Sequence, residues 1–113
     1  MAWNNLDNVA GINSIVDASH ASRQLIFKHS TRCGVSSGAK MRLEGGLEEL
    51  ASHFDLHFLD LLSHRDVSNQ IAQQLGVHHE SPQVIVLDKG EVVFHTSHGM
   101  ISPGYIIDKA ATA

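Results

Sequence analysis

The sequence predicts one α/β domain in which a central four-stranded mixed sheet is flanked by helices. Short apolar runs alternate with segments whose apolar residues recur at helical spacing, in the order α-β-α-β-α-β-β-α. The chain has 113 residues, which can build one hydrophobic core but not two. Its composition, with 42% hydrophobic and 18% charged residues, is that of an ordinary folded protein.

The N-terminal part predicts an arm, a helix and a buried strand. Residues 1–10 carry scattered apolar side chains and are expected to form an arm that leads into the first helix. Apolar residues at helical spacing place this helix over Ile12–Ala21, with Asn13 or Ser14 as its cap. The continuous apolar run inside Arg23–Lys28 is typical of a strand that is buried on both faces of a sheet.

The next part predicts a long helix and a second strand. Apolar residues form a stripe along Cys33–Leu50, which predicts a helix that packs on the core through this stripe. The stripe consists of Met41, Leu43, Leu47 and Leu50. The pair Gly45-Gly46 interrupts the helical pattern, so the helix is expected to bend or to end early there. The apolar residues of His53–Leu62 predict a strand.

The C-terminal half predicts a helix, a hairpin and a closing helix. The expected elements are a helix opened by Ser63 and closed by Gly76, the strands Gln83–Leu87 and Val92–His95, and a final helix from Ser102 and Pro103 to Ala110. Residues Asp88–Glu91 have the composition of a turn, so the two strands are expected to form an antiparallel hairpin. A β-α-β unit followed by a hairpin and a helix is the arrangement of the thioredoxin fold, and we expect such a domain over residues 1–113.

Cys33 is the only cysteine, and it lies where the first predicted strand gives way to a helix. The positive end of the helix dipole and free backbone N–H groups favour the thiolate, the form that reacts. Lys28 and Arg32 are expected to add positive charge around the thiol, and the polar neighbours and Gly34 argue against an inert, buried cysteine. Without a second cysteine the chain forms no internal disulfide, so any exchange runs to another molecule.

The residues before Cys33 are candidates for binding a ligand. His29, Ser30 and Thr31 could donate hydrogen bonds to a thiolate or to polar groups of a ligand, or could serve only the local turn. Arg32 could meet a carboxylate of a small thiol, or could be a solvated surface residue. Both interpretations stay open for each residue.

Several classes of function are disfavoured by composition. The net charge is −4, from 8 basic and 12 acidic residues without a basic run, so neither nucleic acid nor an anionic membrane is an expected partner. The apolar runs are too short to cross a bilayer, and residues 1–9 do not resemble a secretory signal, so a cytoplasmic location is expected. The nine histidines do not complete a zinc-binding set, so no metal is expected.

Three segments resemble the monothiol bacilliredoxins, which are thioredoxin-fold proteins of the bacillithiol system. They are Phe-Lys-His-Ser-Thr-Arg-Cys over residues 27–33 with a serine at Ser36, Ser-Pro-Gln-Val over residues 81–84, and Glu-Val-Val-Phe-His-Thr-Ser-His over residues 91–98. The similarity runs from the first predicted strand to the final helix. It implies a thiol-disulfide oxidoreductase that removes bacillithiol from protein mixed disulfides through one nucleophile, Cys33.

The resemblance also implies roles for other residues and partners. Ser36 takes the place of a thioredoxin's resolving cysteine, and Pro82 matches the cis-proline that faces the thiol. Together with Ser81, Gln83 and the segment from His29 to Arg32, these two residues are expected to bind the substrate or the small thiol. The implied partners are bacillithiolated proteins, a low-molecular-weight thiol as co-substrate and a separate disulfide reductase, without a bound cofactor. Gly34 stands where the family usually has proline.

Two other functions remain as alternatives. Cys33 and Ser36, with Lys40 and Arg42 nearby, are similar in spacing to the motif of arsenate reductases. A non-enzymatic sensor or adaptor is the other alternative, because an accessible, reactive thiol suits sensing as well as catalysis. Turnover beyond one equivalent would separate an enzyme from a sensor.

Overall fold

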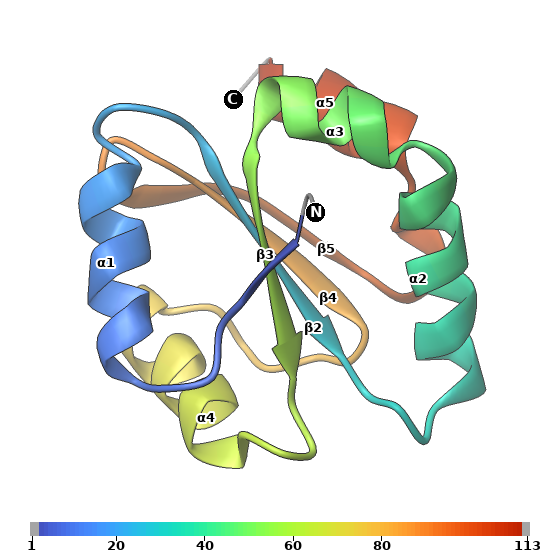
Figure 1. Ribbon diagram of the computed structural model, residues 1–113, viewed down its shortest axis with the longest axis horizontal. Coiled ribbons are helices and arrows are strands. Elements are labelled where there is room, and N and C mark those ends of the chain that lie inside the picture. Colours follow the sequence, from blue (N-terminus) through green and yellow to red (C-terminus); the bar gives the residue numbers. More distant parts are fainter. Residues whose placement is uncertain (1–2, 112–113) are drawn as a thin grey trace.

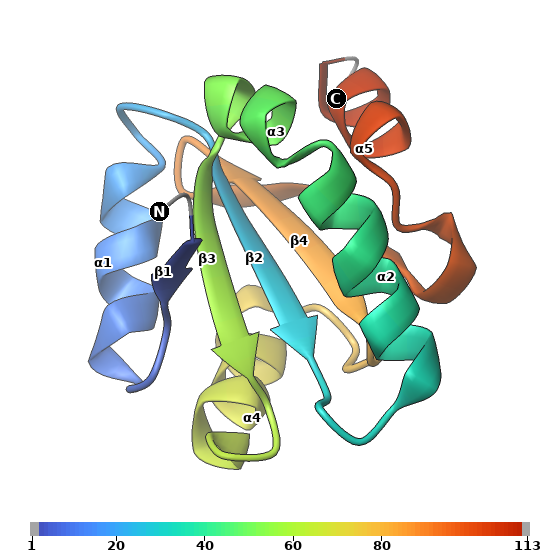
Figure 2. The ribbon, with the colours of Figure 1, turned by 45° about the vertical axis from the view of Figure 1, so that its right-hand side comes forward.

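A five-stranded mixed sheet lies between two layers of helices in the computed structural model, which describes residues 3–111 (Figures 1 and 2). The strands are β1 (Trp3–Asn5), β2 (Gln24–His29), β3 (Asp55–Asp60), β4 (Gln83–Asp88) and β5 (Glu91–Ser97). Their order across the sheet is β1-β3-β2-β4-β5. Strands β1, β3 and β2 are parallel, whereas β4 runs antiparallel to both β2 and β5. The α/β class and the mixed sheet are therefore confirmed.

Helices cover both faces of the sheet. One layer contains α1 (Ala10–Ala18) and α4 (Arg65–Leu75), and the other contains α2 (Gly34–Gly45), α3 (Leu47–His53) and α5 (Pro103–Ala111), with the short 3-10 helix η1 (His98–Met100) before α5. Side chains of a strand alternate between faces, so Leu25 and Phe27 pack under α2, α3 and α5 while Ile26 packs under α1 and α4. Within residues 3–111, no helix is long and apolar enough to cross a membrane.

The sheet has five strands where four were predicted, because part of the expected N-terminal arm forms a strand. Residues Trp3–Asn5 form the edge strand β1, which pairs in parallel with β3, and the N–H of Leu6 donates to Phe58 O at 2.9 Å. The Trp3 ring packs against the rings of Phe27 and Phe58, with centroids 5.8 and 5.9 Å away. This strand has three residues and two of them are exposed, so no apolar pattern marked it in the sequence. The rest of the expected arm lies in the link to α1, apart from residues 1 and 2, which lie outside the described part.

The single helix expected over Cys33–Leu50 is divided into α2 and α3. Gly46 lies between them with φ −125° and ψ 27°, outside the helical region. A Cβ atom at this position would lie 2.7 Å from two ring carbons of Pro103, at the start of α5. The glycine therefore allows the chain to turn in close contact with another helix. Met41, expected in the core as part of the apolar stripe, lies within α2 and is 73% exposed, so this part of the prediction was wrong.

Several helix boundaries differ from the predicted ones. Helix α1 begins at Ala10, where Oδ1 of Asn8 accepts the N–H of Gly11 at 2.9 Å, so neither Asn13 nor Ser14 caps it. Helix α4 begins at Arg65 rather than at Ser63, whose hydroxyl donates to the Asp60 carboxylate at 3.2 Å. The predicted end of α4 is confirmed, since Gly76 has the left-handed backbone (φ 69°) that commonly terminates helices.

The close approach of Gly46 to Pro103 leads to a stability prediction. Gly46→Ala should lower the free energy of unfolding by about 1–3 kcal/mol, because the proline ring cannot move aside without shifting α5. Gly45→Ala is the matched control, since its Cβ would meet open space and alanine favours helix by up to about 1 kcal/mol. Denaturant unfolding of both variants measures the difference. Equal stability of the two variants would contradict the proposed contact.

Candidate active site

Cys33 occupies the N-cap position of α2, directly after the carboxyl end of β2. Its backbone is extended (φ −108°, ψ 120°), its N–H donates to Ser30 O at 3.2 Å, and its C=O accepts the N–H of Ser37 at 3.0 Å. The side chain is partly exposed, and its sulfur forms no hydrogen bond with a described residue. The expected position at the start of a helix is confirmed. The first backbone N–H groups of α2 are therefore directed toward the region of the thiol.

A buried hydrogen-bond network holds the loop between β2 and α2. Oγ of Ser36 accepts the N–H of Ser30 at 3.0 Å and lies 2.7 Å from Nδ1 of His29. Ser36 is fully buried, and the direction of its hydrogen bond with Nδ1 follows the tautomer of the imidazole, because a hydroxyl can donate one hydrogen bond and accept two. The hydroxyl thus joins the end of β2 to the first turn of α2.

His29 is kept neutral by its surroundings. Only 5% of the residue is exposed, and its ring packs against the rings of Phe27 and Phe58, with centroids 5.7 and 5.5 Å away. Burial, followed by the positive charge of Lys40, lowers the pKa of His29 below its ordinary value of 6.5. A neutral ring has one N–H and one acceptor nitrogen, so Nδ1 can take either role toward Ser36. The side chains of His29 and Ser36 therefore support the loop from beneath, and their contact with a substrate or small thiol stays a prediction.

The second expected segment lies beside the end of β2. Gln83, the first residue of β4, pairs with Lys28 of β2, and the Ser81–Pro82 peptide before it is cis, as the family resemblance implied. Pro82 is buried, and its carbonyl accepts the N–H of His98 at 3.1 Å. The buried side chain of Gln83 donates from Nε2 to His78 O at 3.0 Å and so holds the loop. Oγ of Ser81 is buried without a hydrogen-bond partner among the described residues.

The sequence predicted that Lys28 adds positive charge around Cys33. This prediction was wrong. Lys28 alternates with His29 along β2, so it points to the opposite face of the sheet, where it is fully buried under α4. Its Nζ lies 3.3 Å from Ser68 O and 3.2 Å from Nδ1 of His79. Burial lowers the pKa of Lys28 from 10.5 to about 8. The contact joins the end of β2 to the loop that carries Pro82. Its only sign in the sequence is a lysine placed within an apolar run.

Three histidines have structural partners within the fold. His29 is joined to Ser36 and His79 to Lys28, while Nε2 of His57 lies 2.7 Å from Oε1 of Gln24. Burial is the largest cause that lowers the pKa of each of these three rings. Among residues 3–111, no three side chains of histidine, cysteine, aspartate or glutamate gather as a set of metal ligands.

Two hollows flank the loop before Cys33, and Thr31 lines both. One, of about 400 Å³, lies along α2 and is lined by His29, Lys40, Glu44 and Phe58 among others. The other, of about 360 Å³, is lined by Thr31, Arg32, Leu62, Ser63 and Arg65. Sequence reasoning had identified Thr31 and Arg32, both exposed, but not Arg65, which the first turn of α4 supplies.

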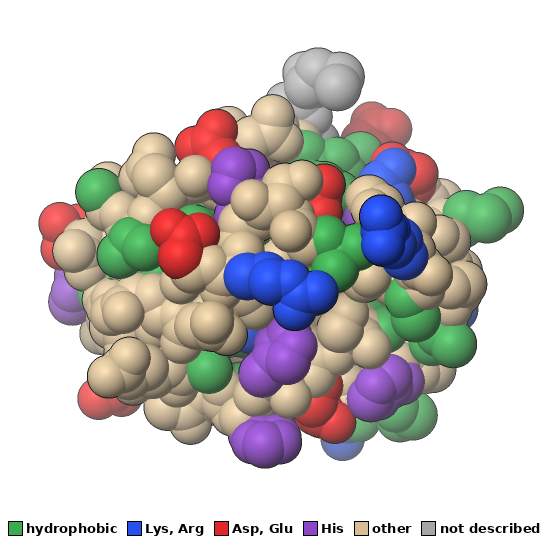
Figure 3. Space-filling model, turned by 90° about the horizontal axis from the view of Figure 1, so that it is seen from below, with side chains coloured by type: hydrophobic (Ala, Val, Ile, Leu, Met, Phe, Trp, Pro, Cys, Tyr) green, Lys and Arg blue, Asp and Glu red, His purple; other side chains and the backbone are tan. Residues whose placement is uncertain are grey.

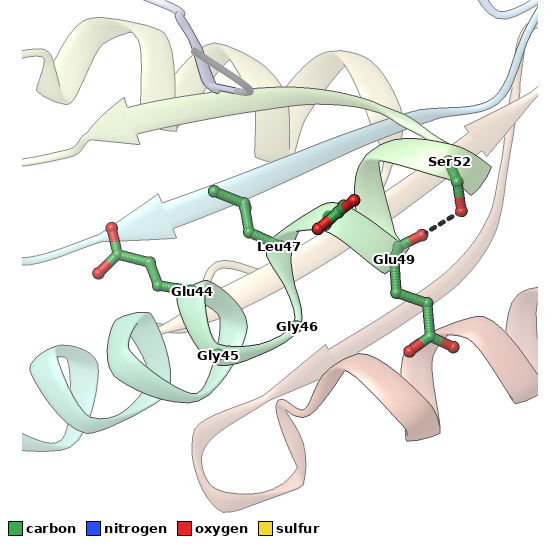
Figure 4. A pocket seen from close by; sticks show the side chains of 7 residues that line it. Glu44, Gly45, Gly46, Leu47, Glu49 and Ser52 are labelled. Carbon is green, nitrogen blue, oxygen red and sulfur yellow. Dashed lines mark hydrogen bonds between the residues drawn. The ribbon is translucent and has the colours of Figure 1, made fainter.

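A larger hollow of about 620 Å³ lies at the junction of α2 and α3 (Figure 4). It belongs to the far end of the 12-residue helix α2, roughly 16 Å along the axis from the start of that helix. Its acidic side chains are Glu44, Glu48 and Glu49, and the carboxylates of Glu44 and Glu49 point in different directions (Figure 4). This hollow carries neither a nucleophile nor converging groups, so the candidate site remains at Cys33.

Comparisons with known proteins agree with this geometry. A family model described as monothiol bacilliredoxin BrxC matches residues 4–106. A solved structure described as a candidate oxidoreductase with a thioredoxin fold is 26% identical, with 96% of this chain and 93% of that chain covered and a TM-score of 0.84.

Two thioredoxins share the fold at lower identity. The thioredoxin of Fasciola hepatica is 12% identical, with 96% of this chain and 97% of that chain covered and a TM-score of 0.73. Mitochondrial thioredoxin 3 of Saccharomyces cerevisiae is 14% identical, with 98% and 95% covered and a TM-score of 0.73. These likenesses confirm the predicted thioredoxin-like fold.

The network around Ser36 leads to a second prediction. Ser36→Ala leaves the N–H of Ser30 and Nδ1 of His29 buried without their shared partner, so the free energy of unfolding should fall by about 1–3 kcal/mol. Ser37→Ala, at the exposed neighbouring position, should change it by less than about 0.5 kcal/mol. Urea unfolding at pH 7 compares the two variants. A loss confined to Ser37→Ala, or shared equally, would refute the structural role.

Burial of Lys28 predicts a pH-dependent stability. Between about pH 8 and 10.5 the unfolded chain binds a proton that the folded chain has released, so the free energy of unfolding should rise with pH in this range, by up to about 3 kcal/mol. Lys28→Met should remove this rise, whereas Lys89→Asn, at an exposed lysine, should retain it. Urea unfolding from pH 7.5 to 10.5 gives the slopes. The same slope in Lys28→Met and wild type would exclude the assignment.

Proposed function

Because the chain belongs to the monothiol bacilliredoxin family, we propose that it removes bacillithiol from proteins that carry it as a mixed disulfide, with Cys33 as the nucleophile. The protein is a thiol oxidoreductase of the thioredoxin fold. The observation that supports the finer proposal is the partly exposed thiol of Cys33 at the N-cap of α2, in a chain with one cysteine. We also propose the cytoplasm as its location, because thiols there are kept reduced.

The proposed reaction is a thiol–disulfide exchange without net oxidation. The Cys33 thiolate attacks the bacillithiol sulfur of the mixed disulfide, the old S–S bond breaks, and the thiolate of the target protein leaves. A new S–S bond then joins Cys33 to bacillithiol. The sulfur reacts from the N-cap position of α2, where the first backbone N–H groups of the helix face its surroundings.

A second molecule completes the cycle. Ser36 stands three residues after Cys33, but it has no sulfur and its buried hydroxyl is committed to His29 and Ser30. A second low-molecular-weight thiol therefore attacks the adduct and releases free Cys33, or a separate disulfide reductase does so. No bound cofactor takes part in this sequence.

Residues near the thiol divide into two proposed groups. Thr31 and Arg32 are exposed beside Cys33 and are proposed to contact the small thiol, together with the backbone of Ser81 and Pro82. The buried side chains of His29, Ser36 and Gln83 and the backbone of Ser30 form hydrogen bonds within the protein, and these residues are proposed to hold the binding residues in place. Gly34 leaves the first helical position without the rigid ring that proline would supply there.

An arsenate-reductase-like function is less well supported. Such a function needs cationic groups free to hold an oxyanion at the thiol. Lys40 is paired with Glu44 at 3.1 Å, and Arg42 donates to Ile101 O at 2.8 Å and to His98 O at 3.0 Å. Neither of the two cations in the predicted motif is therefore free to bind an oxyanion beside Cys33.

The proposal predicts catalytic transfer of bacillithiol. A bacillithiolated protein incubated with substoichiometric enzyme and excess bacillithiol should be released over several turnovers, and intact mass should show bacillithiol on Cys33 as an intermediate. Cys33→Ser should abolish release, whereas Ser37→Ala should leave it near wild type. Release by Cys33→Ser at the wild-type rate would refute the mechanism. Release that stops at one equivalent would indicate a sensor.

A further inference from the structure

The hollow of about 360 Å³ beside Cys33 is formed by two loops that are distant in sequence. Its lining consists of Thr31, Arg32, Leu62, Ser63 and Arg65, and we call it the arginine hollow. The loops follow β2 and β3, which are neighbouring parallel strands, so both leave the sheet at the same edge. Arg32 directly precedes Cys33 in the chain. Cys33 does not itself line the hollow, but its Cα lies about 3.8 Å from that of Arg32, so a small molecule attached to the thiol has only a short distance to span.

Two guanidinium groups meet at this hollow without a counter-ion. The side chains of Arg32 and Arg65 form no hydrogen bond or ion pair with any residue that the structure describes, although the chain has 12 acidic residues against 8 basic ones. No carboxylate lines the hollow. Asp60, at the end of β3, already accepts hydrogen bonds from Ser63 Oγ and Leu62 N, both at 3.2 Å, and Asp66, which follows Arg65 in α4, forms no ion pair with it. Figure 3 looks at this end and shows Lys, Arg and His side chains on it, with acidic side chains between them.

This arrangement has the chemistry of an oxyanion site. Guanidinium groups present N–H donors in a planar fork that matches a carboxylate, and the Thr31 hydroxyl adds a further donor. The hollow along α2 is less suitable for an anion, because Lys40 is already paired with Glu44 and that carboxylate lines the hollow too. An acidic group is therefore better accommodated by the arginine hollow.

We propose that the arginine hollow binds a carboxylate of the small thiol that exchanges with Cys33, and so selects acidic thiols over neutral or basic ones. The inference rests on the proposed function because it requires the exchange of a small thiol at Cys33. It adds that this thiol is acidic. The volume of about 360 Å³ suits part of a small molecule rather than a protein surface. Arg65 becomes a specificity-determining residue that no sequence pattern had indicated.

Three symmetric disulfides of similar length test the inference without any target protein. They are 3,3′-dithiodipropionate, which is anionic, 2-hydroxyethyl disulfide, which is neutral, and cystamine, which is cationic. In each case the Cys33 thiolate attacks one sulfur, one small thiolate leaves, and mass spectrometry follows the adduct on Cys33. Each rate constant is divided by that of N-acetylcysteine with the same disulfide, which corrects for intrinsic reactivity.

The expected result is a change in the ratio of the corrected rate constant for the anionic disulfide to that for the neutral disulfide. Wild type should favour the anionic over the neutral disulfide, and Arg65→Gln or Arg32→Gln should lower this ratio by about three- to fivefold. Arg65→Lys, which keeps the charge but loses the planar fork, should fall between wild type and Arg65→Gln. Lys89→Asn is the control, because it removes one positive charge from the β4–β5 turn, which is not part of the hollow.

Three outcomes would overturn the inference. They are an unchanged ratio in Arg65→Gln, an equal fall in Lys89→Asn, and an equal slowing of all three disulfides in Arg65→Gln. The measurement is independent of bacillithiol. If the ratio falls as expected but a bacillithiolated protein is not released, the arginine hollow stands and the proposed function fails. If release proceeds while the ratio in Arg65→Gln stays unchanged, the function stands and the hollow has another role.

Discussion

Full burial of β2 at the centre of the sheet is the constraint on which the rest of the site depends. All six residues of Gln24–His29 are buried, and the strand pairs with β3 on one side and β4 on the other. Its last two residues, Lys28 and His29, are polar, so each needs a partner in the interior. His29 finds Ser36 on the face under α2, and Lys28 finds His79 on the face under α4. These two contacts join the end of the strand to the helix of Cys33 and to the loop of Pro82.

The distribution of charge sets this end of the molecule apart from the rest. Elsewhere, Arg23 is paired with Asp88 and Lys40 with Glu44, and Arg42 donates to backbone carbonyls. At the carboxyl edge of β2 and β3, Arg32 and Arg65 have no such partner among the described residues. Two unpaired guanidinium groups at one hollow favour the approach of anions, the thiolate of an attacking small thiol among them. Burial keeps His29 neutral, so that ring adds no charge.

Particular elements show where sequence reasoning was sufficient. Cys33 lies at the start of α2, as the change from an apolar run to a helical pattern indicated, and Gly76 ends α4. The glycine pair at Gly45 and Gly46 indicated a break, although only the contact with Pro103 explains why the chain divides there. Strand β1 left no signal, because it has three residues and is held by pairing with a distant strand rather than by an apolar pattern of its own.

The sequence by itself determined the order of the elements, the position of the single thiol at a strand–helix junction, and the lack of a second cysteine to resolve an adduct. These properties depend on local periodicity and on residue counts, which need no knowledge of distant contacts. Only the tertiary structure decided that Ser36 is a buried support, that Lys28 faces away from Cys33, and that Arg65 lies beside Arg32. Each of these outcomes depends on which face a strand presents and which loops share a sheet edge, and long-range packing alone sets both.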